Sequence, residues 1–160
     1  MLKESGVHTA IETSGFCEWN NLERIIKFTD LVLYDIKHLD PEKHKLFTGV
    51  SNEIILKNLK MICNKEKSVI IRVPLIPDIN DSDSDLLKIA QIAKENRVIE
   101  VHILPFHQMG ESKWYSLDMR YLCAEITSPS QERLNRVREI FEEAGISVNI
   151  GGLGNKVWRA

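Results

Sequence analysis

The sequence has few cysteines, and those it has are widely separated. Three occur among 160 residues, at positions 17, 63 and 123, and no C-x-x-C pair is present. A disulfide framework and a zinc or iron–sulfur knuckle both require closer or more numerous cysteines. The simplest interpretation is three reduced thiols, packed as small apolar side chains.

An excess of one charge and a long apolar run are also absent. The 21 Lys and Arg residues nearly balance the 23 Asp and Glu residues, which leaves a net charge of -2. This balance gives no general attraction to nucleic acid or to an anionic membrane surface, so neither is expected as a partner. No apolar run is long enough to cross a bilayer, and residues 1–5 do not form a basic-then-apolar leader. We expect a cytoplasmic protein.

The residues that are present predict one ordinary domain over residues 1–160. Hydrophobic residues make up 43% and charged residues 28%, and the length is enough to bury a core. Residues 1–6 resemble the last turn of a helix closed by Gly6. Because no helix precedes them, we expect the chain to begin inside a larger fold.

Strand-like and helix-like segments alternate along the chain. Strands are predicted at residues 7–13, 31–37, 69–75, 98–104 and 146–150, the last of them weak and followed by Gly151 and Gly152. Helices are predicted at 20–28, from 41 after a capping Asp40, at 52–64, at 82–96, and from Ser130 to Ala144, while 110–128 is expected to be irregular. The alternation predicts an α/β fold with parallel strands. A closed eight-stranded barrel needs about 250 residues, so we expect a partial (β/α) barrel without its N-terminal strands.

Polar residues follow the predicted strands, where ligands bind in parallel α/β folds. Glu12 and Thr13 end the first strand, Asp35 and Lys37 the second, Arg72 lies in the third, and Leu104 and His107 end the fourth. Several of them also allow simpler interpretations. Asp35 and Lys37 share a strand face and could be only an ion pair, and His107 could be an ordinary loop histidine. Arg72 needs a carboxylate partner because an unpaired buried guanidinium is costly. Together the residues predict a rim that binds an anion or a zwitterion.

Five segments, in order, resemble the activating enzymes of glycyl radical enzymes. Residues 6–16 resemble their G-[IV]-H-T-x-[LIV]-[DE]-T-[SN]-G stretch, and residues 30–37 resemble D-L-x-L-x-D-[IL]-K. Residues 40–52 resemble D-x-x-x-H-x-x-x-T-G-x-x-N, and residues 72–81 resemble R-x-P-x-[IV]-P-x-x-N-D. Residues 104–114 resemble L-L-P-[YF]-H-x-x-G-x-x-K-[YW]. The sequence is therefore most similar to the C-terminal part of a radical S-adenosylmethionine (SAM) activase such as pyruvate formate-lyase activating enzyme.

The resemblance implies a cofactor pair and a reaction. Family members hold a [4Fe–4S] cluster on a C-x-x-x-C-x-x-C loop, and its open iron binds the amino and carboxylate groups of SAM. One electron then cleaves the sulfonium, and the resulting 5′-deoxyadenosyl radical removes a hydrogen atom from a glycine of the partner. The implied activity is that of the [formate-C-acetyltransferase]-activating enzyme type, an oxidoreductase. The implied partners are a glycyl radical enzyme, first of all pyruvate formate-lyase, and a reductant such as flavodoxin.

The resemblance also implies roles for single residues. Glu12 and Thr13 match positions near SAM and, together with Asp35, a monovalent-cation site. Asp35 and Lys37 match contacts to the ribose and methionine parts, Arg72 an arginine near the methionyl carboxylate, and Leu104 and His107 positions around the adenine. The remaining matches surround the opening for the glycine-bearing peptide: Asp40, His44, Thr48, Gly49 and Asn52.

The cluster cysteines of the family have no counterpart in this sequence, nor has its Gly-Gly-Glu stretch. Because such clusters take thiolate ligands, we expect this chain alone to be an inactive, truncated activase that binds neither SAM nor cluster tightly. Two alternatives stay open: a cluster-free module that binds the partner, and an unrelated α/β enzyme using Asp35, Lys37 and His107 in acid–base chemistry on a small anion. The first strand should be an open sheet edge that another copy of the chain covers.

Overall fold

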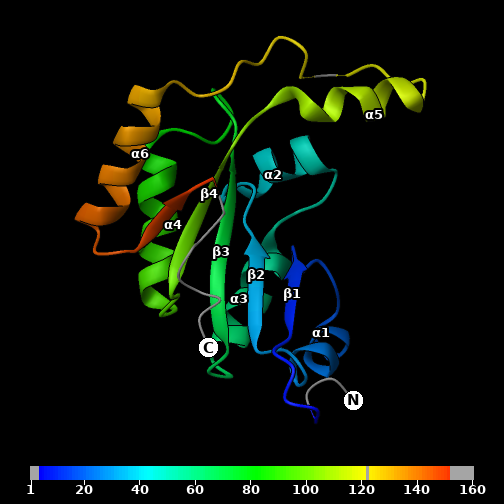
Figure 1. Cartoon of the computed structure of the whole chain (residues 1–160), viewed down its shortest axis with the longest axis vertical. Coiled ribbons are helices and arrows are strands. Elements are labelled where there is room, and N and C mark those ends of the chain that lie inside the picture. Colours follow the sequence, from blue (N-terminus) through cyan, green and yellow to red (C-terminus); the bar gives the residue numbers. More distant parts are fainter. Residues whose placement is uncertain (1–3, 122, 152–160) are drawn as a thin grey trace.

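A five-stranded parallel sheet organises the protein in the computed structural model, which describes residues 4–121 and 123–151 (Figure 1). The strands lie side by side in chain order, and β1 and β5 form the two edges. Their bounds are β1 Ala10–Thr13, β2 Leu31–Asp35, β3 Ser68–Leu75, β4 Glu100–Pro105 and β5 Val148–Ile150. The predicted parallel α/β fold is confirmed: β2 begins at its predicted residue, and the other strands begin one to three residues from theirs.

Helices follow the first four strands, and their starts obey local capping chemistry. Their bounds are α1 Trp19–Ile26, α2 Pro41–Thr48, α3 Glu53–Cys63, α4 Asp83–Glu95, α5 Glu111–Ser116 and α6 Gln131–Glu143, with a short 3₁₀ turn η1 at Gln108–Gly110. The side chains of Asp40, Ser82 and Ser130 each accept a hydrogen bond from a backbone N–H in the first turn of α2, α4 and α6. These caps fix where each helix begins and thereby the loops that precede it.

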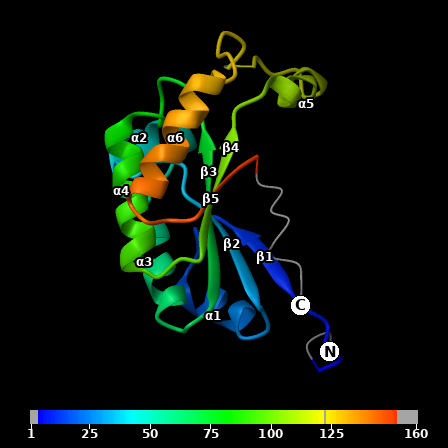
Figure 2. The same ribbon diagram turned by 60° about the vertical axis from the view of Figure 1, so that its left-hand side comes forward.

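The helices α1, α3, α4 and α6 cover one face of the sheet (Figure 2). The side chains of Val32, Tyr34, Ile71, Val73 and Val101 point into this layer and form the buried core with the helices. Because successive strand residues point to opposite faces, the residues between them line the other face. That second face carries Asp35, Arg72 and His102 among apolar residues such as Leu33 and Ile70.

Several details differ from the sequence-based expectations. The segment 110–128 is not wholly irregular, because residues 111–116, which contain neither Gly nor Pro, form α5; in both views α5 lies beyond the carboxyl ends of the strands (Figures 1 and 2). The predicted helix end falls partly on residues 1–3, which lie outside the described residues, as does Gly152. Gly6 has the positive φ of 71° expected for a helix cap.

Across residues 4–121 and 123–151, no helix combines the length and the apolar composition that crossing a membrane would require.

Candidate functional site

Four charged side chains meet where β1, β2 and β3 lie side by side. Asp35 and Arg72 are register partners on β2 and β3, so their side chains leave the same face of the sheet. Lys37 Nζ lies 3.6 Å from Asp35 Oδ2, and Arg72 Nε lies 3.9 Å from Asp35 Oδ1. The Arg72 guanidinium also forms an ion pair with the Glu12 carboxylate of β1. We call Glu12, Asp35, Lys37 and Arg72 the charged rim.

Asp35 is a largely buried member of the charged rim. Its side chain is only 19% exposed, and its Oδ1 is buried without a hydrogen-bond partner. Burial raises the pKa of the Asp35 carboxyl above its ordinary value, and the neighbouring Lys37 and Arg72 oppose the shift. A buried carboxylate oxygen without a donor is uncommon in folded proteins and marks a place where a ligand donor fits.

Two further titratable residues lie beside the rim, and the sequence analysis missed both. His102 on β4 is the register partner of Arg72 and is 5% exposed. Its Nε2 lies 2.8 Å from Glu100 Oε2, and Ser147 Oγ donates to Glu100 Oε1 at 3.3 Å. The alternation of Glu100 and His102 between buried apolar residues could have shown that they share the face of Arg72.

In the loop after β1, the backbone of Gly15 packs closely against the side chain of Tyr34. Gly15 has a φ of 68°, and a Cβ at this position would lie 1.7 Å from the Tyr34 hydroxyl oxygen. Tyr34 in turn donates to the Ile55 carbonyl at 2.7 Å, and Asn58 Nδ2 donates at 2.8 Å to the carbonyls of Gly15 and Cys17. Packing against the T-S-G part of the first motif therefore fixes the loop that follows Glu12, while Glu12 itself is placed by its register with Leu33 of β2.

Buried asparagines brace the loops after β2 and β3 in the same manner. Asn52 Nδ2 donates to the carbonyls of His38 and Leu39, at 2.9 and 2.8 Å. Asn80 Nδ2 donates to the carbonyls of Lys37 and Pro74, at 2.7 and 2.6 Å, so one side chain joins the two loops. Because both amides are buried, their role in this structure is to hold Lys37 and its neighbours in place.

The residues expected near the peptide opening build α2 and its two ends. Asp40 caps α2 and Gly49 closes it with a φ of 83°. His44 is buried, with Nδ1 2.7 Å from the Val50 carbonyl and 3.0 Å from Thr48 Oγ1. The Thr48 hydroxyl also donates to the His44 carbonyl at 2.7 Å. Together with Asn52, these side chains hold residues 40–52 in place through hydrogen bonds within the chain.

The remaining predicted residues lie at the edges of this arrangement. Thr13 pairs with Tyr34 in register, and its Oγ1 accepts from the Gly15 N–H at 2.9 Å. Leu104 is the partner of Pro74 on the face of the charged rim. His107 precedes η1 beyond the carboxyl end of β4, and its side chain is exposed. The sheet order thus puts these residues at the same end as the rim.

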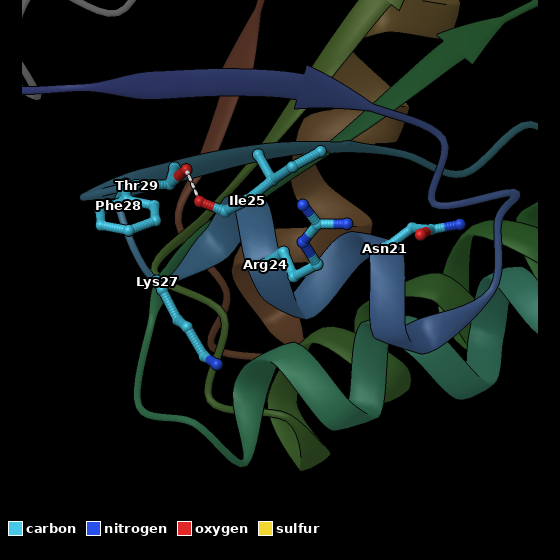
Figure 3. A pocket seen from close by; sticks show the side chains of 6 residues that line it. All are labelled: Asn21, Arg24, Ile25, Lys27, Phe28 and Thr29. Carbon is cyan, nitrogen blue, oxygen red and sulfur yellow. Dashed lines mark hydrogen bonds between the residues drawn. The ribbon is translucent and has the colours of Figure 1, made fainter.

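One wide depression in the surface lies away from this site. A wide hollow of about 820 Å³ lies against α1 and the loop before β2, at the amino end of the strands (Figure 3). Figure 3 shows Ile25 and Phe28 with Arg24 and Lys27, and none of the charged rim lines it. A smaller cavity of about 210 Å³ lies at the carboxyl ends of β2 and β3, and Lys37 lines it. We regard the smaller cavity as part of the site because it shares a residue with the rim.

The described residues contain no group of three or more His, Cys, Asp or Glu side chains that could hold a metal ion. The three cysteines, all partly buried, are free thiols on separate elements.

Comparisons with curated proteins find activating enzymes as relatives along most of the chain. The chain is 38% identical over 154 residues to the trans-4-hydroxy-L-proline dehydratase activating enzyme of Clostridioides difficile, covering 95% of this chain and 51% of that protein. It is 38% identical over 150 residues to a 4-hydroxyphenylacetate decarboxylase activating enzyme of the same species, covering 92% and 48%. It is 39% identical over 127 residues to the isethionate sulfite-lyase activating enzyme of Oleidesulfovibrio alaskensis, covering 78% and 41%.

Solved structures agree on the fold. A domain of pyruvate-formate lyase-activating enzyme from Bacteroides vulgatus superposes with a TM-score of 0.77 at 24% identity, covering 94% of this chain and 84% of that one. A radical SAM methyltransferase from Sphaerobacter thermophilus superposes with a TM-score of 0.67 at 16% identity, covering 91% and 41%. No family model matches the sequence. The chain spans about half the length of the curated relatives it matches. The homologues of this chain are thus radical SAM activating enzymes of glycyl radical enzymes, which it matches over about half of their length.

Proposed function

We propose that this chain is the SAM-binding and partner-facing part of an enzyme that activates a glycyl radical enzyme. The observation that carries the proposal is the charged rim, where two cations and two carboxylates meet at the ligand-binding end of a parallel sheet. The homologues named above support it, since each is an activating enzyme. In the whole protein, SAM bound at a [4Fe–4S] cluster would supply the 5′-deoxyadenosyl radical that removes a hydrogen atom from the partner's glycine.

The charged rim fits the polar parts of SAM. The planar guanidinium of Arg72 suits the methionyl carboxylate, for which it would exchange its pairing with Glu12. The buried Asp35 Oδ1 can accept a hydrogen bond from a ribose hydroxyl or an ammonium group. Lys37, beside Asp35, adds a second cation. The monovalent-cation site at Glu12, Thr13 and Asp35 stays a proposal; in this structure Glu12 pairs with Arg72, and the Thr13 hydroxyl accepts from the Gly15 N–H.

The residues described do not fit a [4Fe–4S] cluster, which takes its protein ligands from cysteine thiolates. We therefore propose that the 160-residue chain alone does not cleave SAM, and no step of its chemistry is assigned to it. A cluster-free module that only binds the partner remains the second candidate, supported by the same absence of ligand groups in the described residues. The homologues argue against an unrelated enzyme acting on a small anion.

The partner is proposed at the level of its class. The relatives' names specify a dehydratase, a decarboxylase and a sulfite-lyase, and the structural neighbour's name specifies pyruvate formate-lyase. We propose a glycyl radical enzyme, among which pyruvate formate-lyase is one candidate, a flavodoxin-type reductant for the whole protein, and a cytoplasmic location. We also propose that β1, an edge strand over the described residues, pairs with a second copy of the isolated chain.

Calorimetric titration with SAM tests the role of the charged rim. Arg72→Gln removes the proposed carboxylate partner, and we expect it to weaken binding at least about tenfold, since a hydrogen bond to a charged group contributes about 1.5–3 kcal/mol. Arg136→Gln is the matched control, because Arg136 forms ion pairs with Asp83 and Glu139 far from the rim. Equal affinities of the two variants, both melting at the wild-type temperature, would contradict the proposal.

A further inference from the structure

The turn between β3 and α4 holds the backbone of Lys37 in place. Asn80, in this turn, is buried, and its Nδ2 donates to the Lys37 carbonyl at 2.7 Å and to the Pro74 carbonyl at 2.6 Å. Its Oδ1 accepts from the Ile76 N–H at 2.8 Å. One side chain thus uses both of its polar atoms to connect the turn with Lys37, a member of the charged rim. A shift of Asn80 would therefore shift the Lys37 backbone.

The same turn contains a residue in an unfavourable backbone conformation. Asp78 has a φ of 62°, in the left-handed region that residues other than glycine adopt at a cost. Its N–H donates to Asp81 Oδ1 at 2.9 Å. Because Asp81 directly follows Asn80 in the chain, this contact stabilises the part of the turn that carries Asn80. The shape of the turn therefore depends on how well the Asp81 carboxylate is itself held.

Arg133, in the first turn of α6, holds Asp81 from outside the turn. Its guanidinium donates to the Asp81 carbonyl, and its Nε lies 3.6 Å from Asp81 Oδ2. Its Nη1 also donates at 2.5 Å to Asp83 Oδ1, in the first turn of α4. The side chains of Arg133 and Asp81 are only 24% and 21% exposed, so solvent and salt screen this pair less than a fully exposed one. Arg133 thus joins α6 to the turn and to α4.

Arg136, one turn further along α6, has no such connection with the turn. It pairs with Asp83 at 3.2 Å, with Glu139 at 3.2 Å and with Glu143 at 3.9 Å, and none of these contacts involves Asp81. In both views α6 lies beside α4 (Figures 1 and 2). The two arginines therefore share one carboxylate of α4, while Arg133 alone of the two also contacts the turn.

We propose that Arg133 is a positioning residue for the charged rim. It holds Asp81, Asp81 stabilises the turn, and Asn80 in that turn holds the Lys37 backbone. This role rests on the proposed function, since the affinity it changes is that for SAM. It follows that the packing of α6 against α4 and the binding of SAM are coupled, and that each strengthens the other.

Hydrogen exchange of the isotopically labelled chain tests these contacts without a ligand. In Arg133→Gln, we expect the side-chain amide of Asn80 and the Asp78 N–H to exchange at least about tenfold faster, since exchange follows the free energy of local opening. The N–H groups of Val32 in β2 and Val101 in β4 should keep their wild-type rates. Unchanged rates in the strands separate a local loosening of the turn from a general loss of stability.

Arg136→Gln is the matched control, because it removes a pairing of the same helix with the same Asp83. We expect it to leave the exchange of Asn80 and Asp78 unchanged. Arg133→Lys, which restores a cation at the position, should recover part of the protection lost in Arg133→Gln. Wild-type exchange at Asn80 in Arg133→Gln, or equal acceleration in Arg136→Gln, would overturn the positioning role.

Titration with SAM tests whether these contacts matter for binding. Arg133→Gln should weaken SAM binding about threefold or more, the scale on which substitutions outside a binding site change its coupling to distant groups. It should cause no further loss in a chain that already carries Lys37→Met, because the proposed effect reaches SAM through Lys37. An equal loss in both backgrounds would show that Arg133 does not act through Lys37.

Failure of this role and failure of the proposed function give different results. If SAM shifts no signal of the charged rim in the wild type, the proposed function is wrong, and faster exchange at Asn80 in Arg133→Gln would still support the contacts from Arg133 to Lys37. If Arg72→Gln loses SAM affinity while Arg133→Gln binds SAM as the wild type does, the positioning role is wrong and the proposed function stands.

Discussion

Gly15 is the residue whose identity is most tightly constrained by the fold. Any Cβ there collides with the Tyr34 ring, and the φ of 68° disfavours other residues. Gly15→Ala should lower the free energy of unfolding by about 2–4 kcal/mol, the sum of backbone strain and overpacking. Gly145→Ala is the matched control, with a similar φ of 77° but open space around it, and should cost only about 1 kcal/mol. Urea unfolding of both variants checks the difference, and equal losses would show that the Tyr34 contact is unimportant.

Asp35 should make the protein less stable as the pH rises. Its folded-state pKa is raised above the ordinary value of 3.8, so the folded chain holds the proton more tightly than the unfolded chain. This contribution is complete below the ordinary value and is lost as the pH rises through the raised value. We therefore expect the melting temperature of Asp35→Asn, relative to that of the wild type, to rise as the pH is raised from 4 to 7.

Asp83 provides a control of opposite sign. Ion pairing with Arg133 and Arg136 lowers the pKa of the Asp83 carboxyl. Its contribution is present above the ordinary value and is lost as the pH falls through the lowered value, so the deficit in melting temperature of Asp83→Asn relative to the wild type should stay nearly constant from pH 7 to pH 4 and shrink below about pH 4. Thermal melts of the two variants showing the same trend with pH would refute the assignment of burial as the dominant cause at Asp35.

For single residues, the sequence predicts which charged side chains form the site better than it predicts their contacts. Asp35, Lys37 and Arg72 could be placed together because they end neighbouring strands, and the expected carboxylate partner of Arg72 is Glu12. His102 and Glu100 were not predicted, although their alternation along one strand puts them on the same face. That His102 lies directly opposite Arg72 depends on register, which the sequence does not specify. The burial of Asp35 Oδ1 without a hydrogen-bond partner likewise follows from packing and could not be predicted from the sequence.

Among the elements, the loops at the carboxyl ends of the strands depend on buried amides. Asn52→Ala removes the donor for two carbonyls, and we expect a loss of about 2 kcal/mol in the free energy of unfolding, because unsatisfied buried groups are costly. Asn64→Ala, at the exposed C-cap of α3, is the control and should change stability by less than about 0.5 kcal/mol. Chemical denaturation measures both, and a neutral Asn52→Ala would mean that the loop holds its shape without the amide.

Helix starts were predictable from sequence where a capping side chain precedes the helix. Asp40 followed by Pro41, and Ser130, are such signals, and both caps are present. α5 was not predicted because it has no side-chain cap and only six residues, so local sequence gives little warning of it. The motif from Asp40 to Asn52 was expected to face the partner, a role that stays a prediction, while its side chains are engaged within the chain.

For the whole molecule, the edge at β1, which has no second strand partner among residues 4–121 and 123–151, is the feature most relevant to behaviour in solution. An uncovered edge strand presents unpaired backbone groups to a second chain. We expect the isolated chain to sediment as a dimer at micromolar concentration, and Ala10→Pro, at an exposed position of β1, to shift it to the monomer. Circular dichroism of the variant is the control that it is folded. A wild-type chain that stays monomeric at high concentration would contradict this pairing.

The order of strands, the parallel topology and the family were all accessible from the sequence, because alternation and five ordered motifs act over the whole chain. The proposed function rests on the SAM site, and the chain spans about half of its curated relatives. The 160-residue chain, reconstituted with iron, sulfide and a reductant, is expected to release no 5′-deoxyadenosine from SAM. Stoichiometric release by this chain would show that its own residues hold the cluster.

The most direct test of the account is to map SAM onto the isolated chain by nuclear magnetic resonance. With the isotopically labelled protein, we predict that SAM shifts the backbone signals of residues 12–15, 35–37 and 72–74 and that sinefungin, which keeps the methionyl and adenosyl parts, shifts the same set. Binding in the millimolar range, about 4 kcal/mol, is enough to see this. Shifts confined to the hollow beside α1, or no shifts at all at 10 mM ligand, would contradict the claim that the charged rim is a SAM site.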